Sequence, residues 1–407
     1  MRMLSFTALL MAALAGAIQT RATDPMLPAI ALDLGVPLRD AFLLASAFAL
    51  PFGLMQLVLG PTGDALGKVR VIRVALIVIA IGTVITALAP NYEMALLGRI
   101  LTGAASGGSV PVTMALVSDL VPFAQRPAAI ARVMVAATTG QVMGAAATGL
   151  LIDIIGWRGV FLLLAGLIGI VALFVLATIE TGDAPTRRFS LSRAISDYGS
   201  ILSNPSARLL MAFVFCNGFF ISGIFPALAP LFAQRGASGP FEAGMLIATF
   251  AAGGLVFGIA MRWLASRITL PGLMRTGYFL GGLGYLAVFQ PLPWPVIVPF
   301  GLMVGLCFFS QQNANLSMMT ELAPSARGSA VAMLLFGLFV GQTIGPVVWG
   351  YLGEQTNFAV PFAVSGIALL LLGAIAPPVL RRAGLPPEPP IEQPTDAHGE
   401  AGKPSSA

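Results

Sequence analysis

The chain has 407 residues, of which 57% are hydrophobic and only 10% are charged, and its mean hydropathy is +0.90. A soluble protein carries about 25% charged residues, so this composition excludes a soluble globular domain and predicts an integral membrane protein. The net charge of +5 requires no nucleic-acid partner, because the cations fall between apolar runs. Two cysteines within apolar runs and one histidine near the C-terminus predict neither a disulfide framework nor a metal site.

About 20 apolar residues cross a bilayer as a helix, and by this measure the sequence predicts twelve spans. They run over Leu4–Asp24, Ala41–Leu59, Val71–Ala89, Met94–Leu120, Ala128–Ile155, Val160–Ala177, Leu209–Ala233, Phe241–Trp263, Leu273–Phe289, Pro295–Met318, Gly328–Leu352 and Phe358–Val379. The first span follows Arg2 and could be a signal peptide, but we expect an uncleaved first helix.

The cations predict the orientation. With the N-terminus inside, seventeen of the 22 Lys and Arg residues fall on the cytoplasmic side, whereas Arg39, Arg158 and Arg235 fall outside. Arg21 and Arg99 remain within spans. Because cytoplasmic loops are rich in Lys and Arg, we expect both termini in the cytoplasm.

A long polar interval divides the spans six and six. We therefore expect an N-terminal six-helix bundle over 1–179, a cytoplasmic linker over 180–208 with a surface helix near Leu191–Leu202, and a C-terminal six-helix bundle over 209–380. The proline-rich segment 381–407 is expected to be a disordered cytoplasmic tail.

An internal repeat supports this division. Asp119 and Arg126 recur as Glu321 and Arg327, at offsets of 202 and 201 residues. Three glycines recur at a constant offset of 201 residues: Gly140, Gly144 and Gly149 match Gly341, Gly345 and Gly350. The two halves are therefore expected to have similar structures.

The segment between spans 2 and 3 reads Gly60-Pro61-Thr62-Gly63-Asp64-Ala65-Leu66-Gly67-Lys68-Val69-Arg70. We expect a short charged turn, sharpened by its glycines. It resembles the G-x-L-x-D-R-x-G-R-[KR] signature of the major facilitator superfamily at Gly60, Asp64, Gly67 and Lys68, whereas Ala65 and Val69 replace basic residues. The alternative is a hairpin whose cations only set the topology.

The resemblance covers about Leu4 to Leu380. It implies an all-α integral membrane protein with twelve transmembrane helices in two pseudo-symmetric six-helix bundles, working by alternating access. The chain has no G-x-x-x-x-G-K-[ST] sequence, so nothing indicates that ATP drives it. We expect no enzymatic activity and no cofactor.

Three further stretches resemble superfamily motifs. Asp119 and Arg126 match a D-x-x-P-x-x-x-R segment, and could either hold the two halves together at an inner gate or simply set topology. Gly140, Gly144 and Gly149 resemble an antiporter motif, although Ala145 stands in place of its proline; Gly341, Gly345 and Pro346 form the second copy. Close helix packing is the alternative for these glycines.

Arg99 resembles the arginine of an R-x-x-Q-G-x-G pattern, and a charge within a span should face a cavity or a partner. The segment from Arg21 to Leu34 resembles the start of twelve-helix drug:proton antiporters. Asp24 is the acidic residue nearest the expected cavity, and is our candidate for proton coupling. The alternative is a salt bridge at the outer surface, before Pro25.

Amide side chains within spans need partners. With Arg21 and Arg99, the amides are candidates to line the substrate cavity, or else they join helices: Gln141, Asn217, Gln311, Gln312, Asn315 and Gln342.

The preferred function is proton-coupled efflux of small apolar or cationic compounds. The first alternative is proton-coupled uptake or exchange of a small organic anion, with Arg21 and Arg99 as its contacts. The second is a membrane sensor or scaffold without flux. We expect a monomer in the bacterial inner membrane, with the lipid bilayer, a small-molecule substrate and protons as its partners and no nucleic acid.

Overall fold

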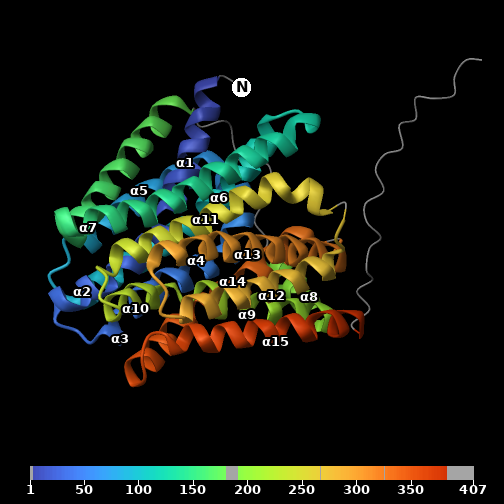
Figure 1. Cartoon of the computed structure of the whole chain (residues 1–407). Helices are drawn as coiled ribbons and strands as arrows, with labels where there is room; N and C mark the ends of the chain where they lie inside the picture. Colours follow the sequence, from blue (N-terminus) through green and yellow to red (C-terminus); the bar gives the residue numbers. More distant parts are fainter. Residues whose placement is uncertain (1–2, 180–190, 266, 325, 383–407) are drawn as a thin grey trace, which may run out of the picture.

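The computed structural model describes residues 3–179, 191–265, 267–324 and 326–382, and every regular element in these ranges is a helix (Figure 1). The first half contains α1 (Met3–Ala22), the 3-10 helix η1 (Asp24–Met26), α2 (Leu27–Leu34), α3 (Leu38–Ala41), α4 (Leu43–Leu66), α5 (Lys68–Ala87), α6 (Tyr92–Leu120), the 3-10 helix η2 (Phe123–Gln125) and α7 (Arg126–Thr178).

The linker helix α8 (Leu191–Ser203) precedes the second half. That half contains α9 (Pro205–Cys216), the π-helix η3 (Asn217–Ser222), the 3-10 helix η4 (Phe225–Ala227), α10 (Leu228–Gln234), α11 (Pro240–Ala265), α12 (Leu270–Phe289), α13 (Trp294–Leu322), α14 (Arg327–Gln355) and α15 (Val360–Arg382).

The helices account for the twelve predicted spans. Within the described ranges, ten helical segments are long and apolar enough to cross a membrane. One of them, α7, has 53 residues and contains both span 5 and span 6. The two spans meet at Gly156, whose non-helical backbone (φ 67°, ψ 169°) bends the helix. The helix α12 has 20 residues, about the length that crosses a bilayer, and is the remaining span.

Two predicted boundaries were wrong. Span 1 does not end at Asp24, because η1 and α2 carry it on to Leu34. The expected turn from Gly60 is helical, since α4 continues to Leu66. Gly67 alone links α4 to α5, with a φ of 90° that favours glycine.

The internal repeat of the sequence is also a repeat of contacts. A methyl group on Gly140 would overlap the carbonyl oxygen of Leu14, and one on Gly341 would overlap that of Phe215. Phe215 lies 201 residues after Leu14, just as Gly341 lies 201 residues after Gly140. Small residues at these positions let the helix backbones approach closely.

The remaining motif glycines pack in the same way. Gly144 and Gly345 lie against the carbonyls of Ile18 and Phe219, which are again 201 residues apart. Gly149 packs against the backbone of Gly244, at the start of α11. These glycines therefore serve close packing, both within and between the halves.

The first helix of each half is interrupted at equivalent places. Pro25 lies in η1 and Pro226 lies in η4, 201 residues later. Proline has no backbone N–H to continue the helical hydrogen bonds of the preceding turn. The breaks place the ends of α1 and η3 opposite each other in the middle of the protein.

The halves contact each other along α4 and α14, on the side predicted to face outward. The backbone N–H of Arg39 donates to Glu354 (2.9 Å) and the Ser46 hydroxyl donates to the Thr343 carbonyl (2.6 Å). One turn further in, a separate aromatic contact joins Phe52 to Phe339, with ring centroids 4.2 Å apart.

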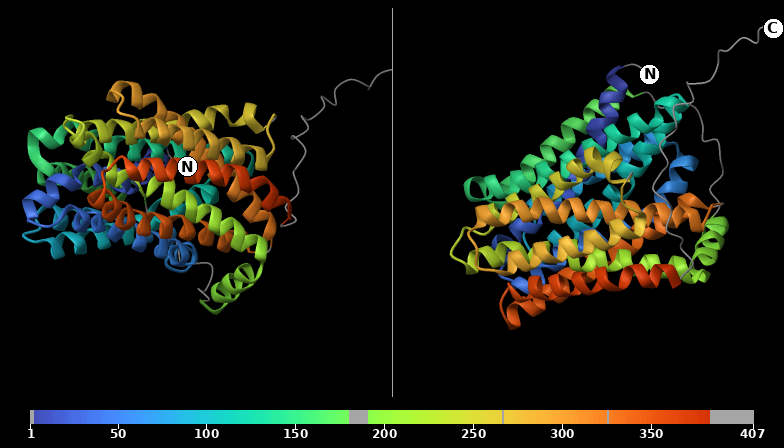
Figure 2. Two further views of the ribbon diagram at one scale, coloured as in Figure 1. Left: turned by 60° about the horizontal axis from the view of Figure 1, so that its bottom comes forward. Right: turned by 45° about the vertical axis from the view of Figure 1, so that its right-hand side comes forward.

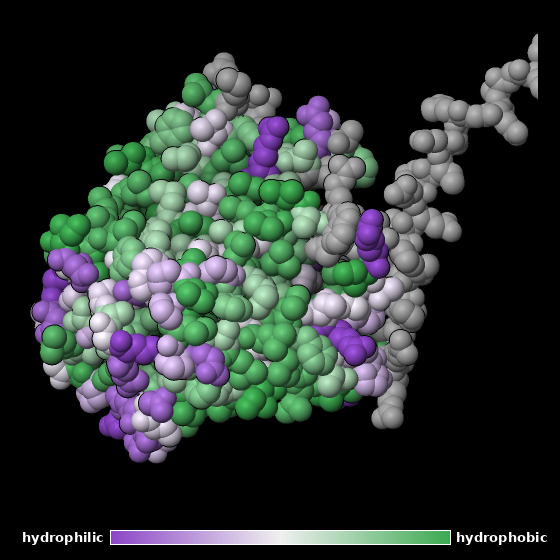
Figure 3. Space-filling view, viewed as in Figure 1, coloured by the Kyte–Doolittle hydropathy of each residue, from purple (hydrophilic) through white to green (hydrophobic). Residues whose placement is uncertain are grey.

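The opposite ends are arranged differently. Figure 2 shows helices of the two halves spreading apart toward the end that carries the N-terminus, where α8 also lies. Here α8 contacts both halves: Tyr198 donates to the Leu57 carbonyl (2.8 Å), and Ser329 donates to Asp197 (3.2 Å). Hydrophilic residues gather at the two ends of the helices, on either side of a hydrophobic belt (Figure 3).

Candidate functional site

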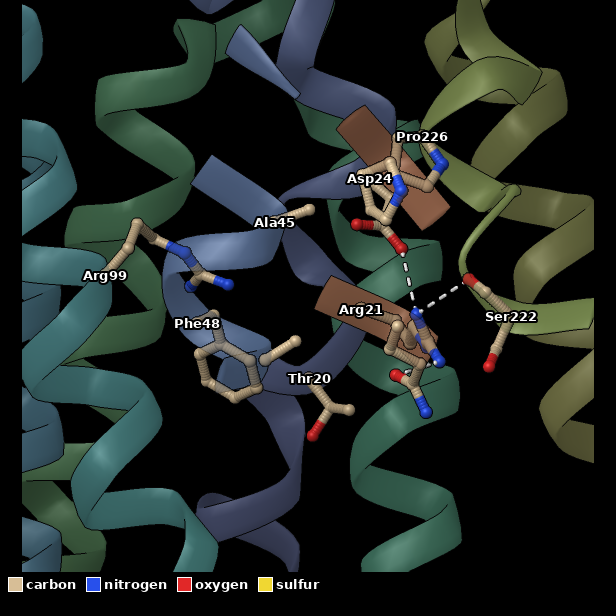
Figure 4. A pocket seen from close by; sticks show the side chains of 11 residues that line it. Thr20, Arg21, Asp24, Ala45, Phe48, Arg99, Ser222 and Pro226 are labelled. Carbon is tan, nitrogen blue, oxygen red and sulfur yellow. Dashed lines mark hydrogen bonds and ion pairs between the residues drawn. The ribbon is translucent and has the colours of Figure 1, made fainter. Parts of the chain in front are cut away.

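A small pocket lies at the helix breaks, between the two halves (Figure 4). Its polar side chains come from α1, η1, α6, η3 and α14, so both halves contribute to it. The lining residues are Thr20, Arg21, Asp24, Ala45, Phe48, Ala49, Arg99, Ser222, Pro226, Gln342 and Pro346.

Arg21 connects the halves at this pocket. Its Nη1 lies 3.4 Å from Asp24 Oδ2 and donates to the Ser222 carbonyl at 3.3 Å. Its Nη2 donates to Gln342 Oε1 at 2.9 Å. The guanidinium also lies over the Phe225 ring, 4.9 Å from its centroid. A single side chain of the first helix thus contacts three elements of the other half, η3, η4 and α14.

Arg99 approaches from the opposite side of the pocket (Figure 4). Only 2% of its surface is exposed. Its Nε donates to the Leu44 carbonyl (3.4 Å) and its Nη1 donates to Gln19 Oε1 (3.3 Å). The Phe48 ring centroid lies 4.5 Å from its Cζ. Within the described ranges, no carboxylate forms an ion pair with Arg99.

The charges at the pocket do not balance. Arg21 and Arg99 are cations, and the only acidic residue among those that line the described pocket is Asp24, which is 3% exposed. Charged groups within a membrane protein normally pair or face a pathway. With all three groups charged, the pocket has an excess positive charge that an anion would neutralise.

The structure brings together four of the predicted cavity and proton-coupling residues: Arg21, Asp24, Arg99 and Gln342. Asp24 lies inside rather than at the outer surface, because α2 adds two further turns beyond it. Pro346, predicted as a packing residue, lines the pocket as well.

The other amides do not line this pocket. Gln141 is half-buried on α7 and Gln312 is half-buried on α13. Asn217, Gln311 and Asn315 are fully buried inside the C-terminal half. Sequence alone could not separate these amides from Gln342, because only the packing decides which helix face meets the other half.

Two residues of the loop motifs form an ion pair. Lys68 Nζ is 2.6 Å from Asp119 Oδ2, which ties the start of α5 to the end of α6. Arg126 instead donates to the Val121 carbonyl (3.3 Å) and lies over the Phe123 ring. These contacts lie within one half, so their role in a gate between the halves stays a prediction.

Gly60 and Asp64, the first two matching residues of the motif between spans 2 and 3, both lie within α4. The Asp64 side chain lies outside the described part of the structure.

Sequence reasoning missed three groups at the site. These are the Gln19 side chain, the Phe48 ring and the Ser222 carbonyl. The repeat could have indicated the last of them, since Ser222 lies 201 residues after Arg21.

A comparison with protein families decides which family this fold and pocket belong to. The family model described as Major Facilitator Superfamily matches residues 9–325 and 210–406. The chain belongs to this superfamily. It is therefore a multi-pass membrane transporter with a small-molecule substrate, and not an enzyme.

Similar proteins support this assignment. A Cupriavidus necator protein named as a sulfoacetate transporter, SauU, is 26% identical over 377 residues, covering 86% of each chain. A Pseudomonas aeruginosa protein named 4-hydroxybenzoate transporter PcaK is 24% identical over 408 residues, covering 88% of this chain and 90% of the other. A Salmonella paratyphi B protein with the name multidrug resistance protein MdtD is 23% identical over 399 residues, covering 83% of this chain and 84% of the other.

A solved structure shows the fold. A bacterial homologue of the human lysosomal transporter Spinster, in an inward-facing and unoccupied conformation, superposes with a TM-score of 0.73. It shares 18% identity and covers 93% of this chain and 96% of its own. This facilitator-superfamily transporter thus has the predicted twelve-helix fold.

Proposed function

We propose that this facilitator-superfamily protein transports a small organic anion together with protons. The observation that carries the proposal is Arg99, a buried guanidinium that no described carboxylate neutralises. A carboxylate or sulfonate matches the donor geometry of a guanidinium, which binds such groups through two parallel hydrogen bonds. Arg99 is therefore the proposed primary contact of the anion.

Arg21 is the proposed second contact, and Asp24 controls it. While Asp24 is ionised, it pairs with Arg21 (3.4 Å) and competes with an incoming anion for the same guanidinium. A proton on Asp24 removes that competition and leaves Arg21 free to bind the anion. Proton and anion are then bound together, which is the arrangement of a symporter.

The same contacts link binding to movement of the halves. Arg21 of the first half donates to the Ser222 carbonyl and to Gln342 of the second. An anion that takes these donors from Ser222 and Gln342 changes the contacts between the halves. A ligand can shift a conformational equilibrium only through such differences in contacts between states.

The pocket is nearly closed in this structure. Its cavity volume is about 10 Å³, about the space of a single water molecule, so binding of the anion requires the two halves to move apart around it. The names of two relatives, a sulfoacetate transporter and a 4-hydroxybenzoate transporter, denote substrates that bear acidic groups.

Efflux of apolar or cationic compounds is the second candidate, and the relative named as a multidrug resistance protein supports it. The excess positive charge at the pocket disfavours a cation there. We further propose that the protein works as a monomer in a bacterial inner membrane, in keeping with its bacterial relatives.

Flux into proteoliposomes tests the proposal. Small carboxylates, sulfonates and lipophilic cations would be offered with and without an inward proton gradient. We expect gradient-dependent uptake of an acid by the wild type, and its loss in Arg99→Ala. Arg39→Ala, at a largely exposed outer arginine, is the matched control and should transport normally. Movement of cations against protons, with no acid transported, would overturn the anion proposal in favour of efflux.

A further inference from the structure

Three amide side chains lie inside the C-terminal half, outside the pocket. Asn217 is the first residue of η3, while Gln311 and Asn315 lie one turn apart on α13. Each has 0% of its surface exposed. Within the described residues, none of their amide oxygens and nitrogens has a hydrogen-bond partner. Buried polar groups are nearly always paired, so these atoms require partners that the helices do not supply.

The amides lie where η3, α12 and α13 meet. Gln311 lies directly against the backbone of Gly277 in α12, where an added Cβ would be 2.8 Å from its Cγ. The next residue, Tyr278, donates to the Phe213 carbonyl (3.3 Å), and the backbone N–H of Asn217 bonds to that same carbonyl. The Phe213 carbonyl therefore links the start of η3 to Tyr278, which follows the residue that Gln311 packs against.

We infer that these amides form a buried binding site for water. Each primary amide offers both donors and an acceptor. A metal cation would contact only the oxygens, an anion only the nitrogens, and an apolar ligand neither. Water both donates and accepts, and a buried water typically makes about three hydrogen bonds to such groups.

The position of the site connects it to the pocket. Asn217 and Ser222 are the two ends of η3, and the Ser222 carbonyl accepts a hydrogen bond from Arg21. Turns of π-helix inside α-helices occur frequently at functional sites. The bound water lies at the start of the segment that contacts Arg21, and it supports that segment whichever substrate the protein carries.

Radiolytic footprinting of the wild-type protein in lipid nanodiscs tests the inference directly. Hydroxyl radicals generated from bound water modify side chains that bulk solvent does not reach. We expect modification of the buried Tyr278, which lies beside the site, and little modification of Phe161, an equally buried ring in the other half. Equal protection of both rings would overturn the proposal.

Substitutions provide a second, independent measurement, the melting temperature. Asn217→Leu and Gln311→Met each remove one side of a shared water site and leave the other amide unpaired. We expect each variant to lower the melting temperature, and the double variant to lower it by less than the sum. Gln141→Met, at a half-buried amide in α7, is the control and should change it little.

Two results would contradict a water site. If the amides were unpaired in a dry interior, each substitution would raise the melting temperature and the effects would add. If they held a cation, sodium would raise the melting temperature of the wild type relative to choline, and Asn217→Leu would abolish that difference.

Discussion

Arg21 and Ser222 occupy equivalent positions in the two halves, 201 residues apart, and they contact each other: Arg21 Nη1 donates to the Ser222 carbonyl at 3.3 Å. The pseudo-symmetric fold places these two positions face to face where α1 and η3 end. Because one position carries a guanidinium and the other presents a carbonyl, the symmetry of the fold produces an asymmetric contact. That contact lies at the proposed anion site.

Replacing Arg99 by lysine should weaken anion binding while keeping the charge. Lysine is a point charge that cannot form the two parallel hydrogen bonds of a guanidinium. Each hydrogen bond to a charged group contributes about 1.5–3 kcal/mol, so we expect KM for the acid to rise about tenfold or more. Initial rates of uptake over a range of acid concentrations measure this. An unchanged KM would remove Arg99 from the proposed site.

Replacing Asp24 by asparagine should separate transport from the proton gradient. Asparagine cannot take up a proton, and it leaves Arg21 without its ion pair (3.4 Å in the wild type). We expect exchange of acid across the membrane to continue, while accumulation driven by an inward proton gradient is lost. Counterflow and gradient-driven uptake in the same proteoliposomes distinguish the two. Gradient-driven accumulation at the wild-type level would show that Asp24 is not the coupling group.

Adding a methyl group at Gly140 or Gly341 should destabilise the protein. Each glycine lies against a carbonyl of the neighbouring helix, of Leu14 or Phe215, and a Cβ would overlap that oxygen. Forcing extra atoms into a packed interior costs about 1–3 kcal/mol. Melting temperatures of Gly140→Ala and Gly341→Ala should therefore fall. Gly166→Ala is the control, because a Cβ there meets nothing within 4 Å.

Removing the Tyr198 hydroxyl should loosen the contact between α8 and the first half. Burial, and then the neighbouring Asp197, raise the pKa of Tyr198, so the hydroxyl remains a donor to the Leu57 carbonyl (2.8 Å). A hydrogen bond contributes about 0.5–1.5 kcal/mol, so Tyr198→Phe should shift the equilibrium between conformations by roughly fivefold.

Distances between spin labels on the inner ends of the two halves measure that shift. Tyr351→Phe, at a tyrosine with 59% of its surface exposed, should leave the distance distribution unchanged. If Tyr198→Phe gave the wild-type distribution too, the contact between α8 and α4 would have no part in setting the conformation.

The sequence by itself determined that this is an integral membrane protein, that it has twelve spans and that its two halves repeat each other. Apolar runs of about 20 residues have few alternatives to membrane helices, and a repeat at 201 residues requires two similar halves. Arg21, Asp24 and Arg99 could be singled out because charges within spans are costly. Two helix ends were predicted wrongly, since η1 and α2 continue past Asp24 and α4 continues to Leu66.

Only the tertiary structure decided which of these residues meet. Gln342 and Gln141 are 201 residues apart and follow equivalent glycines, yet only Gln342 reaches the pocket, where it accepts from Arg21. Arg99 pairs with Gln19 and lies over Phe48 rather than pairing with Asp24. The spacing of residues along one helix defines its faces, but the packing of twelve helices determines what each face contacts. The charge balance of the pocket therefore emerged only from the structure.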